Sequence, residues 1–182
     1  YVIEDLNDTK IIFNQFNYSK KKNINKAKNE IVIKNNMGFR EFYNFHKFTL
    51  EKNNEKISYD FNLLNRICIA GYKNKSAKIF AAYDKTNNLH SAYLLIWDAE
   101  SAYLLISAID PDYKSLGSSS LLIYEMICFA STVTKKFDFE GSMISSVESS
   151  FRKFGAIQKP YFHVYKSSRS YKLLQLLKKA IN

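Results

Sequence analysis

The chain has 182 residues, 46% of them hydrophobic, and a formal net charge of +10 at neutral pH. This length can bury one sizeable core, so we expect a single domain over residues 1–182. No apolar run is long enough to cross a bilayer and no signal-peptide pattern is present, which excludes a helical membrane span and favours a cytoplasmic location. Because the sequence opens on Tyr1 rather than Met, we expect a piece of a longer protein, with an N-terminal lobe before it.

The positive charge comes almost entirely from lysine, with arginine only at Arg40, Arg66, Arg152 and Arg169. The arginine guanidinium is the group best suited to bind phosphate with two hydrogen bonds, and arginine is rare here. The excess charge therefore reflects a lysine- and asparagine-rich composition as much as a binding surface. The charge is densest at Lys20, Lys21, Lys22, Lys26 and Lys28. This segment is either a site for a phosphorylated donor, an RNA or an acidic lipid head group, or a solvated helix face.

Cys68 and Cys128 lie inside apolar helical stretches and are interpreted as small core residues of a reducing compartment. No spacing of His, Cys and carboxylate residues suggests a metal site.

Periodicity and turn residues predict the elements of the first half of the chain. These are a strand over 1–6, a helix capped at Asn7-Asp8-Thr9 and running to about residue 29, a strand over 31–34, a helix over 38–52 and a helix capped by Ser58. Three strands follow over 77–83, 89–97 and 101–109. Tight-turn residues join them, so an antiparallel meander is expected.

The second half alternates between helices and strands. It comprises a helix over 118–133 that is apolar on nearly all sides, a strand over 137–140, a helix over 144–154 ended by Gly155, a strand over 156–165 and a helix over 171–181. The order predicts a mixed α/β domain with a part-antiparallel, part-parallel sheet.

The connection after the third meander strand is the most informative segment. The strand breaks at Asp110-Pro111, a short loop carries Lys114 and Gly117, and a helix starts from Ser118, Ser119 and Ser120. A helix N-terminus attracts anions, and small residues let a phosphate approach the backbone. The pattern fits a phosphate-bearing coenzyme, or else an ordinary capped helix. It is neither a Walker loop nor a dinucleotide fingerprint.

This order of elements, with its loop Lys114-Ser115-Leu116-Gly117-Ser118-Ser119, resembles the GNAT acyltransferase fold. A closer resemblance is to the Fem-related, BioF2-like acetyltransferase branch. It rests on Asp138-Phe139-Glu140-Gly141-Ser142-Met143-Ile144, on Phe151-Arg152-Lys153-Phe154-Gly155-Ala156 with Tyr161-Phe162 and Lys166 after it, and on the early segment from Ser19 to Ala27. Members of this branch often carry a further N-terminal lobe.

The resemblance implies an N-acyltransferase that uses acetyl-CoA or another acyl-CoA. Its splayed strand, around Ser107, Ala108 and Ile109, would offer backbone N–H groups to the thioester. Gly117, Ser118, Ser119 and Ser120 would hold the coenzyme A pyrophosphate, with help from Lys114. The acceptor would be an amine of a small molecule, such as an amino sugar or amino acid, or of a cell-envelope or polysaccharide precursor.

Acyl transfer to an amine needs a base, donors for the oxyanion and a proton source for the leaving thiolate. Glu140 is the first candidate for base or amine anchor; the alternative is a helix cap or an ion pair with a lysine. Asp138, on the same strand face, is the second candidate. His163 has the right chemistry for a base, or is a half-buried sheet histidine. Tyr161 and Tyr113 are candidate proton donors.

His46 lies on a helix with a mainly aromatic face and is interpreted as a packing residue. Two rival functions stay open. One is Fem-type aminoacyl transfer from aminoacyl-tRNA, which the lysine-rich segment favours. The other is a degenerate GNAT domain that binds a partner without catalysis.

Overall fold

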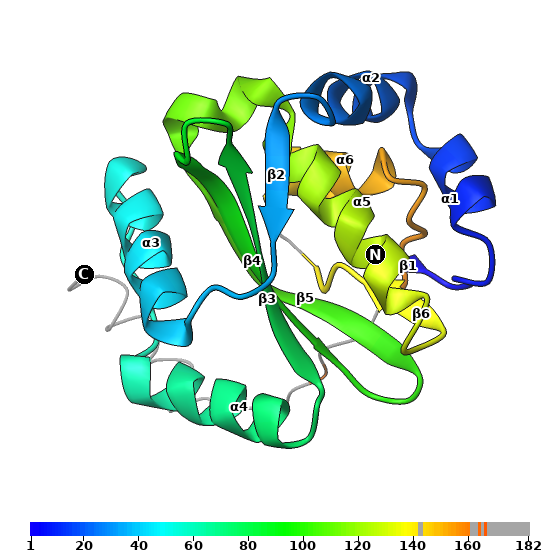
Figure 1. Ribbon diagram of the computed structural model, residues 1–182. Helices are drawn as coiled ribbons and strands as arrows, with labels where there is room; N and C mark the ends of the chain where they lie inside the picture. The colour runs from blue at the N-terminus through cyan, green and yellow to red at the C-terminus, as the bar shows by residue number, and fades with distance from the viewer. Residues whose placement is uncertain (142–143, 161–163, 165, 167–182) are drawn as a thin grey trace.

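A single mixed sheet forms the centre of the molecule (Figure 1). The structure, a computed structural model, describes residues 1–141, 144–160, 164 and 166. Its six strands lie in the order β1-β6-β5-β4-β3-β2. Their bounds are β1 Val2–Ile3, β2 Ile31–Lys34, β3 Ala77–Asp84, β4 Leu89–Trp97, β5 Ser101–Ile109 and β6 Lys136–Asp138.

Only the β5–β6 pair is parallel among the described strands; the others are antiparallel. The expected meander is therefore confirmed, and so is the mixed α/β class with its part-parallel sheet. The parallel pair needs a crossover, and α5 supplies it on one face of the sheet.

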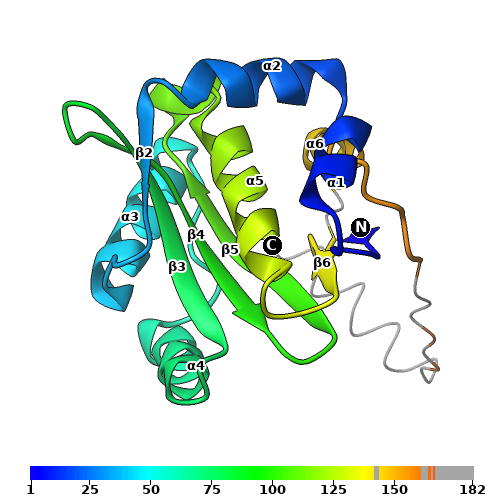
Figure 2. The ribbon, with the colours of Figure 1, turned by 45° about the vertical axis from the view of Figure 1, so that its right-hand side comes forward.

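The helices cover both faces of the sheet. Helices α3 (Phe39–Lys52) and α4 (Phe61–Lys73) lie on one face. The other face carries α1 (Thr9–Gln15), α2 (Tyr18–Ala27), α5 (Ser118–Ala130) and α6 (Ser145–Arg152), as Figure 2 shows. A short 3-10 helix, η1 (Pro111–Leu116), precedes α5. Each face has its own apolar core, so the sheet lies between two cores.

The single helix expected from residue 9 to about 29 is wrong, because the chain breaks at Phe16 and Asn17. Phe16 has an extended backbone and is buried, and the Asn17 side chain caps α2 by accepting from the Ser19 amide. Asp8 caps α1, in line with the expected start. The next cap is also corrected: Asp60, not Ser58, accepts from the Leu63 amide and starts α4.

Several strands and helices are shorter than the sequence predicts. Strand β1 is shorter than 1–6, α5 ends at Ala130 rather than 133, and β6 ends at Asp138 rather than 140. Within 156–160 the predicted strand is reduced to one bridge between Ile157 and Val2. The expected helix over 171–181 lies outside the described residues. The helix predicted over 144–154 is α6, which covers only Ser145–Arg152 with Lys153 as its C-cap, and Gly155, with φ +75°, lies in the turn that follows.

Cys68 is buried in the core under α4, as predicted, and Cys128 is half-buried on α5. Across the described residues, no helix combines the length and apolar character that a bilayer crossing needs.

Candidate active site

The sheet opens between its two parallel strands. β5 and β6 pair only from Ser101↔Lys136 to Tyr103↔Asp138. Just beyond, β5 carries a bulge, because Leu94 faces Ile106 while Leu95 faces Leu104, which leaves Leu105 as the extra residue. A bulge bends and twists its strand, so β5 turns away from β6 here. The stretch 104–109 of β5 therefore has no ladder partner on the β6 side among the described residues.

β6 meanwhile stays attached to the chain's first residues. The Phe139 amide donates to the Tyr1 carbonyl at 2.9 Å, and the Tyr1 nitrogen donates to the Glu140 carbonyl at 2.9 Å. Counting on from Tyr103↔Asp138, Glu140 comes level with Leu105 along the two strands. Glu140 and the bulge thus flank the point where the strands part.

Glu140 has an unusual backbone conformation. Its φ is +62°, a left-handed value that a non-glycine residue adopts at some cost. The Asp138 carboxylate stabilises this conformation by accepting the Glu140 amide at 2.7 Å. Burial, followed by the neighbouring Asp138 charge, raises the pKa of the Glu140 carboxyl above its usual range. A strained backbone and a raised carboxyl pKa in the same residue are features that cluster at functional sites.

Of the other candidate catalytic residues, the structure describes Asp138 and Tyr113. Asp138 holds the turn at Glu140 through the hydrogen bond above, which gives it a structural role. His163 and Tyr161 lie outside the described residues. Tyr113 lies on η1, within the β5–α5 connection, and stacks on the buried His90 ring with centroids 3.9 Å apart.

The predicted anion-binding turn sits where expected, at the start of α5. Gly117 has φ +81°, and no side chain caps the helix. Ser118 and Ser120 are buried, and the Ser118 hydroxyl has no partner among the described residues. The Ser119 hydroxyl is hydrogen-bonded to the Tyr93 hydroxyl at 2.5 Å. Lys114 is exposed on η1.

Helix α2 covers this turn. A Cβ on Gly117 would lie 2.5 Å from the Asn23 carbonyl oxygen, so glycine is required there by the α2 backbone. The α1–α2 segment is also wedged between α5 and the end of α6, since the Phe16 ring packs on both Tyr124 and Phe154. Access to the turn is therefore left on the side of Lys114 and Ser119.

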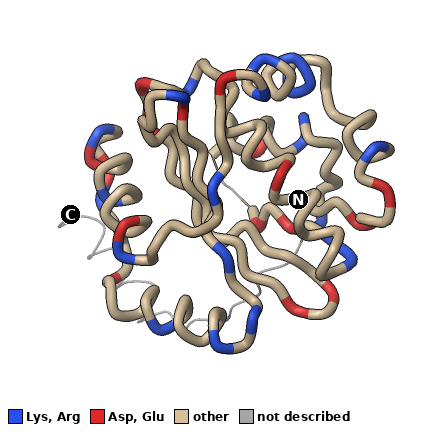
Figure 3. The backbone as a smooth tube through the Cα atoms, in the orientation of Figure 1, with Lys and Arg blue, Asp and Glu red and all other residues tan. Residues whose placement is uncertain are grey.

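The lysine-rich segment is α2, seen as a blue cluster at the top of Figure 3. Part of this charge is used in packing. Lys20 lies over the Phe154 ring and donates to the Ser150 hydroxyl at 2.8 Å, and burial lowers its pKa to about 8. Lys21 donates to the Asn14 carbonyl. Lys22 and Lys26 are exposed.

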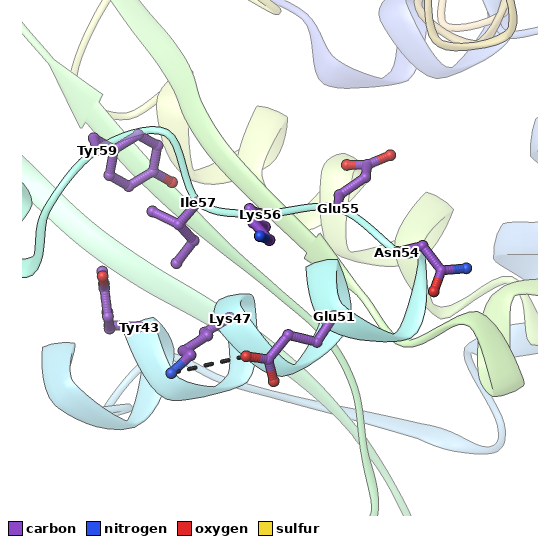
Figure 4. A pocket seen from close by; sticks show the side chains of 8 residues that line it. All are labelled: Tyr43, Lys47, Glu51, Asn54, Glu55, Lys56, Ile57 and Tyr59. Carbon is purple, nitrogen blue, oxygen red and sulfur yellow. Dashed lines mark ion pairs between the residues drawn. The ribbon is translucent and has the colours of Figure 1, made fainter. Parts of the chain in front are cut away.

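On the opposite face of the sheet, α3 and the α3–α4 loop border two adjoining, open pockets. The outer pocket, of about 620 Å³, is lined by Tyr43, Lys47, Glu51, Asn54, Glu55, Lys56, Ile57 and Tyr59 (Figure 4). The inner pocket, of about 360 Å³, reaches the β5 bulge at Leu105, Ile106 and Ser107. Tyr59 lines both. A molecule in these pockets would therefore meet β5 where it leaves β6.

His46, which the sequence indicates as a packing residue, also lines the inner pocket. It is 6% exposed, and its Nε2 atom is 2.7 Å from the Tyr59 hydroxyl. The two residues are 13 positions apart on different elements, so no local spacing links them. The rings of Phe42 and Tyr59 both lie nearly parallel to the His46 ring, with centroids 6.3 and 6.1 Å from it.

No protein-family model matches the sequence, and no curated protein sequence matches it. Solved structures do match. FemX superposes with a TM-score of 0.74 at 12% identity, over 85% of this chain and 57% of the FemX chain. A predicted acetyltransferase from Clostridium acetobutylicum, solved with acetyl-CoA, has a TM-score of 0.59 at 10% identity, over 75% of this chain and 96% of its own.

The aminoglycoside 6'-N-acetyltransferase AAC(6')-Ih from Acinetobacter baumannii gives a TM-score of 0.56 at 10% identity, over 76% of this chain and 98% of its own. The chain thus spans just over half of the FemX chain and nearly the whole length of the two acetyltransferase chains. At these identities the likeness concerns the fold. The chain has the GNAT acyltransferase fold, in a form similar to that of FemX.

Proposed function

We propose that the chain is an N-acyltransferase that moves an activated acyl group onto an amine. One observation carries the proposal: β5 parts from β6 at a bulge that borders the inner pocket on one face and Glu140 at the strand end. Unpaired backbone N–H groups at such an opening are suited to bind a carbonyl oxygen that becomes an oxyanion. The pockets supply room for the amine, and the Glu140 carboxylate serves as its anchor or base.

The donor is first an acyl-CoA. The start of α5 offers uncapped N–H groups and an unpartnered Ser118 hydroxyl, with Lys114 beside it, which suits a pyrophosphate. A bound acyl-CoA would supply the activated thioester. The solved neighbour with acetyl-CoA supports this choice of donor. Gly117, Ser118 and Ser120 would act through their backbone N–H groups, because all three residues are buried.

Aminoacyl-tRNA is the second candidate donor, and the cover formed by α2 favours it. An aminoacyl ester carries no pyrophosphate, so it does not need the covered turn. The exposed Lys22 and Lys26 on α2 would instead attract an RNA backbone. The higher TM-score to FemX than to the acetyltransferases is consistent with this donor.

Calorimetric titration of acetyl-CoA and free coenzyme A separates the two donors. Lys114→Glu is the test variant, and Lys73→Glu, the same charge change in the last turn of α4, is its control. Saturable binding that only Lys114→Glu weakens supports the acyl-CoA donor. If neither ligand binds at millimolar concentration while aminoacyl-tRNA binds with a steep salt dependence, the second donor is correct. Binding of none of these ligands by a folded protein contradicts acyl transfer.

A further inference from the structure

The Tyr59 hydroxyl and the His46 ring form a hydrogen-bonded pair at the lining of the inner pocket. Tyr59 Oη lies 2.7 Å from His46 Nε2, while His46 Nδ1 is buried with no partner among the described residues. A core histidine with one unpartnered ring nitrogen costs stability, because desolvation of that nitrogen is not offset. Packing alone therefore does not account for a histidine here.

The pair faces the bulge in β5. His46, Tyr59, Leu105, Ile106 and Ser107 line the same inner pocket. His46 itself is nearly closed off from solvent, whereas Tyr59 also lines the outer pocket. Tyr59 can thus contact a molecule in either pocket, and the nearly buried His46 is joined to it by the hydrogen bond.

Both groups are held in their neutral forms at physiological pH. Burial lowers the pKa of His46 below its ordinary value, so the imidazole is uncharged and one nitrogen carries a free electron pair. Burial, with a smaller effect of Tyr43, raises the pKa of Tyr59 to about 12, so its phenol keeps its proton. A phenol O–H beside a neutral imidazole nitrogen is a donor–acceptor pair ready to pass a proton.

Other titratable groups surround the two pockets. They are Tyr43, Lys47 and Glu51 of α3 and Glu55 and Lys56 of the α3–α4 loop. Lys47 and Glu51 are paired with each other at 3.8 Å. β5 contributes no titratable side chain to the inner pocket.

We propose that Tyr59 and His46 relay the proton of the acceptor amine, with Tyr59 as the catalytic residue that touches the amine and His46 as the positioning residue behind it. This inference rests on the proposed acyl transfer and gives its acceptor side a mechanism. The amine electron pair forms the C–N bond at the acyl carbon. The amine proton passes to Tyr59 Oη as the phenol proton passes to His46 Nε2. The C–S or C–O bond to the donor then breaks with its electron pair on the leaving group, and the imidazolium releases its proton to solvent.

The relay implies that Glu140 is the amine anchor rather than the base. With the proton taken on the α3 side, the carboxylate at the end of β6 anchors the amine. This division predicts that the two sites fail differently: loss of the anchor raises KM, and loss of the relay lowers kcat.

Tyr59→Phe is the sharpest variant, because it removes the hydroxyl and keeps the ring that stacks on His46. Its control is Tyr72→Phe on α4, a phenol whose pKa burial also raises to about 12 and which lines neither pocket. Acyl transfer to the best amine is measured with the full chain, after thermal melts show that both variants fold. We expect Tyr59→Phe to lower kcat by roughly 100-fold or more and Tyr72→Phe to change it by less than about 3-fold.

His46→Gln tests the second half of the relay through pH. Wild-type kcat rises with pH as His46 loses its proton, with a midpoint below the ordinary histidine value of about 6.5. In His46→Gln this inflection disappears, which a purely structural loss would not cause. Nitrogen NMR of the wild-type ring gives a readout without turnover: the relay requires the neutral tautomer with the proton on Nδ1.

The outcomes separate this inference from the proposed function. Transfer by wild type that persists within about 3-fold in Tyr59→Phe overturns the relay and leaves acyl transfer standing. A ring proton on Nε2 at neutral pH overturns the relay as well. No transfer by wild type to any amine from either donor contradicts the proposed function itself, and the relay with it.

Discussion

The turn at the start of α5 can need glycine at position 117 for phosphate binding or for packing against α2. Replacing Gly117 by alanine tests these two hypotheses. If the glycine serves only the approach of a phosphate, Gly117→Ala weakens ligand binding and lowers stability only by the roughly 1–2 kcal/mol that a left-handed alanine costs. If it exists because α2 packs on it, the same variant destabilises the fold further. In the structure the added Cβ would meet the Asn23 carbonyl oxygen at 2.5 Å, and φ is +81°.

Both features cost free energy. A left-handed alanine costs roughly 1–2 kcal/mol, and forcing an extra methyl into a packed contact costs roughly 1–3 kcal/mol. We therefore expect the free energy of unfolding to fall by about 2–5 kcal/mol, which moves the urea midpoint down by about 1–2 M at ordinary slopes. Backbone shifts in α2 would bring the value to the lower end of this range.

Urea unfolding followed by circular dichroism measures this change. The control is Gly141→Ala, where the new Cβ has open space around it and φ is not positive. It should change stability by less than about 1 kcal/mol. A Gly117→Ala midpoint equal to that of wild type would refute the argument that α2 backbone packing demands the glycine.

Three further predictions concern other parts of the molecule. Phe16→Ala removes a 2%-exposed ring that packs on Tyr124 and Phe154, so chemical denaturation should show a loss of about 3–5 kcal/mol, and a loss under 1 kcal/mol would contradict the wedge. Glu140→Asn relieves the left-handed strain, so thermal melts should show an equal or more stable protein with impaired acyl transfer; lower stability with full activity would reverse the assignment. Because burial lowers the pKa of His46, the unfolded chain binds more protons than the folded chain below pH about 6.5. The wild-type protein should therefore lose stability as the pH falls from there through the folded pKa, and His46→Gln should lose less. Equal losses in the two proteins would contradict a buried neutral ring.

Where the sequence carries a local signal, its prediction agrees with the structure. The meander β3-β4-β5 follows from apolar runs divided by Asp84–Asn88 and Asp98–Glu100 turns, in which the Asp84 and Asp98 carboxylates accept backbone amides. Asp110 likewise accepts the Asp112 amide where the strand was expected to break. These turns are decided within a few residues, so one sequence is enough to find them.

The break at Phe16 and Asn17 was visible in principle, because Asn17 is a good N-cap residue followed by a helical run. The apolar residues spaced through positions 11–24 instead indicate one continuous helix. Ser58 and Asp60 are both capping residue types, and only the fold places Asp60 at the start of α4.

The candidate site was found only in part. Glu140 could be proposed from its position after a short strand, but its φ of +62° depends on Asp138 and on the pairing with Tyr1. The approach of His46 to Tyr59 and of both to the β5 bulge is long-range, and nothing in the spacing of the sequence reveals it. The cover of Gly117 by α2 is equally long-range.

Transfer of a labelled acyl group from acetyl-CoA or aminoacyl-tRNA to a panel of amines tests the central claim most directly. Wild type and Glu140→Gln are compared at equal concentration, with thermal melts to show that both are folded. We predict product from one donor with wild type, and a loss of roughly 100-fold in kcat/KM with Glu140→Gln. Absence of product from both donors with a folded wild-type protein would contradict the account.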